Sequence, residues 1–419
     1  MAAVGLLALV LALFMLRQNL LVVLGMATAY AYVIWGDGQV ANIVIDAWDA
    51  LNKEILLSIP LYILAGNIMS RGAMAARLIR MMQAVSAPIP GGLAIAAVLS
   101  CALFAAVSGS GTVTLLAVGA VMYPALLQAG YSKSFAIGAL CAAGTLGIIV
   151  PPSIPLILYG IMTQTSIADL FIAGVGPAAL LVTLMATYAI LRNRSVGGGN
   201  WSWAEVRDAF RAGVWALVMP ALILGGIYSG YFTATESAAV AVVYAILVET
   251  LVYREMRFAD LYAVIGQTTR LLGSLFPVLM LALSLNVFLA YQQVPELLVG
   301  ALADTISSRA GFLIGMNLFL LAVGCVMDIG SAILILAPIL QPLAAAQGID
   351  PVHFGIITVV NLEIGYLTPP LGLNLIVAMT VFREPFWTIC RAVLPFLALM
   401  LVGLSIVAFF PRLSLFLID

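Results

Sequence analysis

Long apolar stretches follow one another along almost the whole chain, and they restrict the possible folds more than any other feature. Examples are Leu217–Ser229, Ala238–Val252 and Phe396–Phe410 with their flanking residues. A helix needs ~20 apolar residues to cross a bilayer, whereas barrel strands would alternate apolar and polar residues. Only 8% of the residues are charged, against about 25% in a soluble domain. The sequence therefore predicts an all-α integral membrane protein.

Charge and chemistry-bearing residues exclude several classes of function. The formal net charge is −1, so no basic field is available for nucleic acid. His353 is the sole histidine, and the four cysteines stand singly in apolar runs without the C-x-x-C spacing of metal or redox sites. No nucleophile and base pair suggests a membrane enzyme. These absences favour a protein that moves a solute over one that transforms it.

The chain also repeats itself. At an offset of 218 residues, residues that punctuate the apolar pattern coincide in pairs: Pro124 with Pro342, Gly130 with Gly348, Gly147 with Gly365, Pro151–Pro152 with Pro369–Pro370, and Pro177 with Pro395. At 217, Pro60 coincides with Pro277. The sequence thus predicts two repeats, residues 1–195 and 213–419, joined by an interfacial linker at 196–212 that contains three consecutive glycines.

The second repeat is expected to lie upside down relative to the first. Each half appears as two leading spans, an amphipathic stretch, a third span, a hairpin, a broken span and a final span, which makes five crossings. The amphipathic stretches, Val40–Leu51 and Phe258–Thr269, are interpreted as helices in the membrane plane. With the N-terminus outside, all of the 17 Lys and Arg residues except Lys53, Arg309 and Arg412 fall inside or at the inner boundary. This bias follows the positive-inside rule.

Two polar segments interrupt apolar arms that are too short to cross the bilayer. The first is Val107–Thr112, within a hairpin near 91–127, and the second is Val326–Ser331, within a hairpin near 311–346. Arms of about 15 residues rise only ~22 Å, short of the ~30 Å hydrocarbon core. Each segment is therefore predicted to be the tip of a re-entrant helical hairpin.

Two further spans are expected to be broken, near 134–163 and near 353–382. Consecutive prolines remove backbone donors and clash with the preceding turn, and nearby glycines permit unwound backbone. Carbonyls freed upstream of Pro151–Pro152 and Pro369–Pro370 would each cost several kcal/mol in lipid unless something binds them. Together with the hydroxyls of Ser108, Ser110, Thr145 and Thr368, they offer oxygen ligands suited to Na⁺.

The same breaks offer groups that suit an anionic solute. Half-helices begin near Ser153 and Asn374, and their positive dipole ends favour a carboxylate. Asp328 and Glu363 are the acids within these segments. An intramembrane carboxylate can be an ion ligand, a proton carrier or a partner for an exposed helix end, and the sequence leaves these three roles open.

At these residues the sequence resembles the large membrane subunit (DctM/SiaM-like) of TRAP transporters, the tripartite ATP-independent periplasmic transporters of the ion transporter superfamily. The resemblance covers nearly the whole chain. The matching stretches are Ile59–Gly72, Ala106–Ser110, Ala129–Ser134, Gly144–Pro155, Phe171–Pro177, Met327–Pro338 and Gly348–Asn374.

The resemblance implies a multi-pass protein of the bacterial inner membrane that takes up a small organic acid, such as a C4-dicarboxylate or sialic acid. Uptake would be driven by two or more Na⁺ ions, without an organic cofactor. A periplasmic substrate-binding protein would deliver the solute, and a small four-helix membrane subunit would be a separate chain. Hairpins and broken helices would move together in an elevator mechanism.

The resemblance also implies positions for the ions and the solute. One Na⁺ site maps to Ser108, Ser110, Gly144, Thr145, Gly147, Ile148 and Pro151. Its symmetry mate maps to Gly324, Asp328, Gly365, Leu367, Thr368 and Pro369. The solute would lie between the two sites, near Gly111, Thr112, Pro152, Ser153, Ser331, Glu363, Pro370 and Asn374. Gly111 stands where many members carry a small polar residue.

Other functions remain compatible with parts of the pattern. A divalent-anion symporter or exchanger of the same superfamily could share this architecture and work alone. A channel could also use re-entrant hairpins, although two symmetric sets of broken helices favour alternating access.

Overall fold

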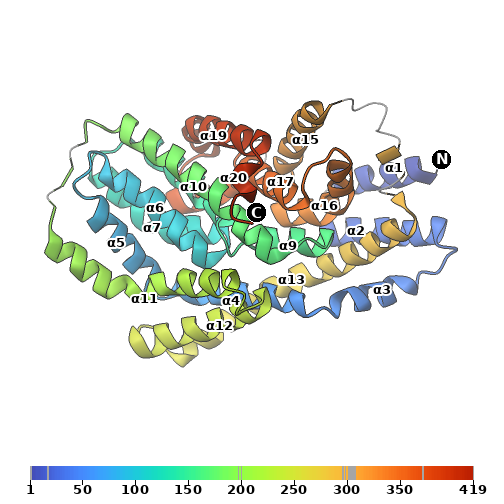
Figure 1. Ribbon diagram of the computed structural model, residues 1–419, viewed down its shortest axis with the longest axis horizontal. Coiled ribbons are helices and arrows are strands. Elements are labelled where there is room, and N and C mark those ends of the chain that lie inside the picture. The colour runs from blue at the N-terminus through green and yellow to red at the C-terminus, as the bar shows by residue number, and fades with distance from the viewer. Residues whose placement is uncertain are drawn as a thin grey trace.

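The computed structural model describes every residue except 1, 17, 197, 200, 295, 296, 298, 301–307, 370, 371 and 419. Every element in this described part of the chain is helical, which confirms the all-α prediction. Figure 1 shows an elongated bundle, with the C-terminus near its centre and the N-terminus at one end.

The first half of the chain forms a series of ten α-helices. They are α1 (Ala2–Met15), α2 (Leu20–Trp35), α3 (Asn42–Leu51), α4 (Ser58–Arg71), α5 (Met74–Ser86), α6 (Gly92–Ser108), α7 (Gly111–Gln128), α8 (Lys133–Thr145), α9 (Ile154–Thr163) and α10 (Ile167–Arg192). Short 3₁₀ segments precede α4, at Glu54–Leu57, and follow α8, at Leu146–Ile148.

The described residues of the second half form the remaining helices. They are α11 (Trp203–Tyr228), α12 (Ala234–Leu247), α13 (Phe258–Tyr291), α15 (Arg309–Gly324), α16 (Ile329–Ala346), α17 (Pro351–Gly365), α18 (Leu373–Phe382), α19 (Phe386–Phe409) and α20 (Arg412–Leu415). A π-helical turn, Val248–Val252, extends α12.

Seven of the described helices are long and apolar enough to cross a membrane, or eight if the bent pair formed by α4 and α5 counts as one span. The seven are α7, α10, α11, α12 with its π-helical turn, α13, α16 and α19. Two of them, α7 and α16, are the second arms of the predicted hairpins, and at 18 residues they are longer than the arms of about 15 residues expected from the sequence. The helices on either side of both predicted breaks, α8 with α9 and α17 with α18, are shorter apolar helices. The chain is therefore a multi-pass membrane protein.

Helices α8 and α17 form the centre of the molecule. Every residue from Phe135 to Thr145 of α8, and from His353 to Gly365 of α17, is buried. Helix α8 packs against α6, α7 and α19, and α17 packs against α15, α16 and α10. Most residues of these helices are apolar, and such helices are buried on every side in a fold; α17 nevertheless also buries Asn361 and Glu363. Their C-terminal ends lead directly into the two breaks.

The two halves differ where the amphipathic stretches were predicted. In the first half, α3 is a separate helix, since Lys53 adopts an extended conformation after it. In the second half, the prediction of a separate amphipathic helix at Phe258–Thr269 is wrong. This stretch continues without a break to Tyr291 as the 34-residue α13. Within the predicted linker 196–212, α11 already begins at Trp203.

The third span of the first half is bent. Helix α4 ends at Arg71, α5 begins at Met74, and their axes differ by 67°. We call this bend, residues 71–74, the elbow. Helix α4 packs against α12 and α13, whereas α5 packs against α11 and α6. The elbow therefore connects helices of the second half to the first helix of the predicted hairpin.

Candidate functional site

The first polar tip lies directly against the first break. Helix α6 ends at Ser108, and α7 begins three residues later at Gly111. A Cβ atom added to Gly147 would lie 2.7 Å from both the carbonyl carbon and the oxygen of Ser110. Only glycine permits this approach of two backbones, so the tip and the 3₁₀ turn after α8 pack as one unit.

This unit brings together most of the first predicted Na⁺ ligands. The Ser108 hydroxyl lies 2.9 Å from Thr114 Oγ1 and donates to the carbonyl of Ser110 over 3.3 Å. A Cβ added to Gly111 would lie 3.3 Å from the Gly144 oxygen and 3.1 Å from the Ile148 side chain. Hydroxyl and carbonyl oxygens therefore gather between α6, α7 and the end of α8.

The two prolines of the first break face different neighbours. Pro151 packs towards α10, where a Cβ added to Gly174 would lie 3.8 Å from its Cδ. The Pro152 carbonyl faces the first tip, 2.8 Å from a Cβ added to Gly109. The ring of Pro151 therefore packs against α10, and its role as an ion ligand stays a prediction.

The second tip meets the second break in the same way. A Cβ added to Gly365 would lie 2.6 Å from Gly324 Cα and 2.7 Å from its carbonyl carbon. The backbone N–H of Gly372 donates to the carbonyl of Cys325 over 3.4 Å. The end of α15, the end of α17 and the chain before α18 are therefore in backbone contact.

Asp328 has a defined structural partner. It is the N-cap of α16, and its carboxylate accepts hydrogen bonds from the backbone N–H of Ser331, at 2.9 Å, and from the Ser331 hydroxyl. Of the three roles left open for Asp328, the structure supports the helix-end partner. Thr368 donates to the carbonyl of Ile364 over 2.8 Å, and Leu367 is buried.

The two prolines of the second break were also predicted to belong to the site. Pro369, predicted for the second Na⁺ site, is half-buried. Pro370, predicted to contact the solute, lies outside the described residues.

Glu363 is placed differently from Asp328. It is fully buried, and its Oε1 accepts a hydrogen bond of 2.8 Å from the hydroxyl of Thr145. Its Oε2 has no hydrogen-bond partner among the described residues. Because its partner is a side-chain hydroxyl of α8, Glu363 does not cap a helix end, and the roles of ion ligand and proton carrier remain.

The contact between Thr145 and Glu363 joins positions 218 residues apart. This is the same offset that aligns the double prolines of the two breaks. Equivalent positions of two inverted repeats can meet only near the axis that relates them. The contact therefore lies where the predicted pseudo-symmetry would place the centre of the molecule.

A cavity of about 190 Å³ opens between the two tips. Gly111 and Thr112 line it, as predicted for solute contacts, and Asp328 lines it from the other tip. Tyr366 also lines it, with its hydroxyl 3.2 Å from Thr112 Oγ1. Further lining residues are Gly109, Ser110, Ile148, Ile154, Pro155, Leu158, Leu275, Ile329 and Gly330.

Several predicted solute residues are not among the described residues that line this cavity. The Ser153 hydroxyl donates to the carbonyl of Ile148 and accepts from the N–H of Leu156 over 3.3 Å. The Asn374 amide donates to the carbonyl of Cys141 over 3.3 Å. These side chains are buried and hold the half-helices α9 and α18 in place.

Tyr366 is the lining residue with a polar side chain that sequence reasoning missed. It stands between Gly365 and Leu367, two residues assigned to the second Na⁺ site, and a tyrosine hydroxyl in a broken apolar helix is itself a signal. Leu158 and Leu275 line the cavity as well. Nothing in the sequence distinguishes them from other apolar residues of their helices.

Comparisons with known proteins agree with this architecture. Residues 7–413 match the family described as the tripartite ATP-independent periplasmic transporter, DctM component. The chain is 40% identical to the C4-dicarboxylate TRAP transporter large permease protein DctM of Pseudomonas aeruginosa, with 94% of this chain and 92% of that protein covered. It is 34% identical to the ectoine TRAP transporter large permease protein TeaC of Halomonas elongata, with 92% and 91% covered.

The fold is also similar to a solved membrane transporter. The structure of MtrF from Neisseria gonorrhoeae, an antimetabolite efflux pump, superposes with a TM-score of 0.68. The match covers 90% of this chain and 85% of that chain at 12% sequence identity. At this identity the likeness concerns the fold alone.

Proposed function

Since the chain belongs to the DctM family of tripartite ATP-independent periplasmic transporters, we propose that it carries a small organic acid across the bacterial inner membrane, driven by Na⁺. The relatives named above are permease subunits for C4-dicarboxylates and for ectoine. The solute of this chain would be a small carboxylate, with C4-dicarboxylates and sialic acid as the first candidates.

The cavity between the two tips is the observation that carries the proposal. Both tips and the first break line it, and the hydroxyls of Thr112 and Tyr366 meet at its wall. Hydroxyl donors of this kind bind a carboxylate without adding net charge. Oxygen-rich contacts between tip and break on each side would hold Na⁺ next to the solute, which couples ion binding to solute binding.

An elevator motion fits the way the helices are joined. The tips and breaks, from α6 to α9 and from α15 to α18, would form the moving part, with the tips as re-entrant hairpins. The long helices α11, α12 and α13 would form the scaffold. A separate small membrane subunit would complete that scaffold, and a periplasmic binding protein would deliver the solute.

The stand-alone symporter or exchanger of the same superfamily is the main alternative. It predicts transport by this chain without a small subunit or a binding protein. Co-purification of a small membrane subunit, together with uptake that needs the binding protein, would exclude it. Uncoupled flux in both directions at high rate would instead favour a channel.

Reconstitution into proteoliposomes tests the proposal directly. We expect uptake of a labelled dicarboxylate or sialic acid when the chain, its small subunit and the cognate binding protein are present with an inward Na⁺ gradient. Collapsing the Na⁺ gradient at constant pH should abolish accumulation. Uptake that follows a proton gradient and ignores Na⁺ would exclude Na⁺ coupling and leave Glu363 as the candidate proton carrier.

The cavity wall gives a prediction about solute affinity. Replacing Thr112 by valine or Tyr366 by phenylalanine should raise the KM for the solute about tenfold, since a hydrogen bond to a charged group contributes about 1.5–3 kcal/mol. The maximal rate should change less than the KM. Initial uptake rates over a range of solute concentrations measure both quantities.

Thr183 provides the matched control for this prediction. It lies on α10, and its exposed hydroxyl donates to the carbonyl of Ala179 in the same helix. Thr183→Val should leave the KM unchanged. An unchanged KM in both Thr112→Val and Tyr366→Phe would place the solute outside this cavity.

A further inference from the structure

The elbow between α4 and α5 lacks an ordinary helix cap. The N-cap position of α5 is Ala73, which makes no side-chain capping bond. The first N–H groups of a helix have no partner within the helix and need one from elsewhere. The N-terminus of α5 is also the positive end of its dipole. A buried anionic group would satisfy both requirements.

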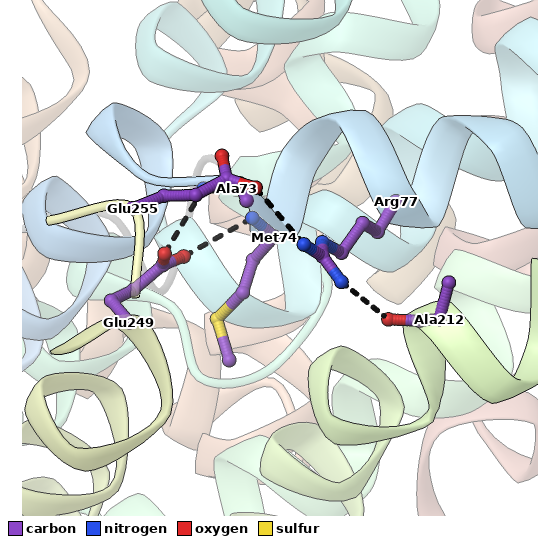
Figure 2. Close-up of polar contacts among 6 residues, drawn as sticks. All are labelled: Ala73, Met74, Arg77, Ala212, Glu249 and Glu255. Atoms are coloured by element: carbon purple, nitrogen blue, oxygen red, sulfur yellow. Dashed lines mark hydrogen bonds and ion pairs between the residues drawn. The ribbon is translucent and has the colours of Figure 1, made fainter. Parts of the chain in front are cut away.

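Glu249 supplies that group from the other half of the chain. It lies in the π-helical turn at the end of α12 and is fully buried. Its Oε2 accepts from the N–H of Ala73 over 3.0 Å, and its Oε1 accepts from the N–H of Met74 over 3.1 Å. Figure 2 shows the carboxylate facing these two residues. Hydrogen bonds to an ionised acceptor are among the stronger ones in proteins.

Gly72 makes the contact possible. A Cβ atom added to Gly72 would overlap the carboxylate carbon and both carboxylate oxygens of Glu249. Its φ of −86° is accessible to alanine, so the carboxylate, rather than the backbone conformation, is the reason that glycine is required here. Gly72 and Glu249 therefore form a matched pair across the two halves.

A second, more exposed set of contacts lies beside this pair. Arg77 of α5 forms an ion pair of 3.0 Å with Glu255 and donates to the carbonyl of Ala212 over 3.2 Å. Its guanidinium also lies 3.7 Å from the centre of the Tyr253 ring. The side chains of Arg77 and Glu255 are 27% and 52% exposed. Solvent weakens an ion pair at this exposure. The buried contact of Glu249 should therefore contribute more to the angle between α4 and α5 than the ion pair of Arg77.

The corresponding position in the first half makes a comparable contact. Tyr32 precedes Glu249 by 217 residues, the offset that aligns Pro60 with Pro277. Its hydroxyl donates to Asp46 Oδ2 on α3 of the same half over 2.5 Å, and it also lies 3.3 Å from the carbonyl oxygen of Ser284 on α13. In each half, the end of the second leading helix thus approaches a helix of the other half, although Tyr32 bonds its own half more closely.

We propose that Glu249 is a positioning residue for transport: it holds the elbow so that α5 and α6 present the first tip to the first break. Helix α5 packs against α6, and α6 ends at Ser108 in the tip. Helix α4 also contacts the tip, because a Cβ added to Gly66 would lie 2.8 Å from the carbonyl oxygen of Ser108. Both helices of the elbow therefore reach the tip, α4 directly and α5 through α6, so the angle between them affects how the tip lies against the first break. This inference rests on the proposed transport function, because its effect is measured as turnover.

The test is a double-mutant cycle of Gly72 and Glu249 in the reconstituted transporter. Glu249→Ala should lower the maximal uptake rate per folded molecule about tenfold, with the solute KM within about twofold of the original. Gly72→Ala should have a similar effect, because the new methyl group displaces the carboxylate. The double variant should be no slower than Glu249→Ala alone, since both changes break one contact.

Controls separate positioning from a loss of folded protein. Size-exclusion chromatography and thermal unfolding in detergent give the amount of folded protein, to which each rate is normalised. Glu249→Gln retains one acceptor oxygen and should give an intermediate rate, which keeps the test informative if Glu249→Ala does not fold. Glu255→Gln breaks only the exposed ion pair and should transport at the original rate.

Two failures are distinguishable. If the unmodified chain shows no Na⁺-driven uptake, the proposed function is wrong. If the unmodified chain transports, and both Glu249→Gln and Gly72→Ala transport at the rate of the unmodified chain per folded molecule, the inference about Glu249 is wrong. Losses that simply multiply in the double variant would also overturn it, because independent contacts give additive effects on free energy.

Discussion

Replacement of Gly365 by alanine is expected to reduce Na⁺-driven uptake by about 10-fold to 100-fold. The added Cβ would lie 2.6 Å from Gly324 Cα and 2.7 Å from its carbonyl carbon, atoms that no side-chain rotation can move away. Overpacking of this kind costs about 1–3 kcal/mol, and each ~1.4 kcal/mol corresponds to tenfold. The second tip would have to separate from the second break. Uptake rate per folded molecule is the measurement.

Gly315 on α15 is the matched control, because a Cβ added there meets no atom within 4 Å. Alanine at this position should leave uptake unchanged and raise the thermal midpoint slightly, since alanine favours a helix over glycine by about 1 kcal/mol. Uptake by Gly365→Ala at the rate of Gly315→Ala would show that transport does not require contact between tip and break.

Replacement of Glu363 by glutamine is expected to raise the half-saturating Na⁺ concentration at least about tenfold. Glu363 is fully buried between the two breaks, and its Oε2 has no partner among the described residues. A buried carboxylate needs a neighbouring cation to remain charged. As a general measure, two opposite unit charges ~8 Å apart at an effective dielectric constant of ~20 attract each other by roughly 2 kcal/mol. Glutamine keeps the shape and removes this attraction.

Two smaller changes accompany this prediction. Thr145→Val removes the donor to Glu363, and Thr368→Val removes the hydroxyl assigned to the second ion site. Each should weaken Na⁺ activation about threefold to tenfold. Thr358→Val is the control, because within the described part of the chain this buried hydroxyl of α17 bonds just the carbonyl of Phe354 in its own helix. Na⁺ activation curves that coincide for all four variants would remove Glu363 and both hydroxyls from the ion sites.

The interruptions of the helices could be predicted because local chemistry determines them. The double proline at Pro151–Pro152 stops helical hydrogen bonding whatever surrounds it, and α8 does end at Thr145, a few residues before it. The polar run at Ser108–Ser110 likewise coincides with the turn between α6 and α7. Proline, glycine and hydroxyl residues therefore located the candidate site along the chain.

Contacts between distant segments were less accessible to sequence reasoning. The direction of a buried polar side chain depends on packing, so the bonds of Ser153 and Asn374 to backbone carbonyls could not be predicted, and their assignment to the solute stays a prediction. The stretch Ala238–Val252 was treated as a plain apolar span. It contains Glu249, and an acid at such a position is a signal in itself. Its partner at the elbow became visible only in the structure.

The glycine contacts between tips and breaks limit how the molecule can deform. Sliding between packed segments requires side chains that change rotamer, and the contact of Gly324 with Gly365 contains none. Each tip is therefore stiffly coupled to its break, and the two must be displaced together. In the proposed elevator motion, sliding would therefore take place at interfaces where flexible side chains, rather than two backbones, meet. The glycine contacts would then mark the segments that move as rigid bodies.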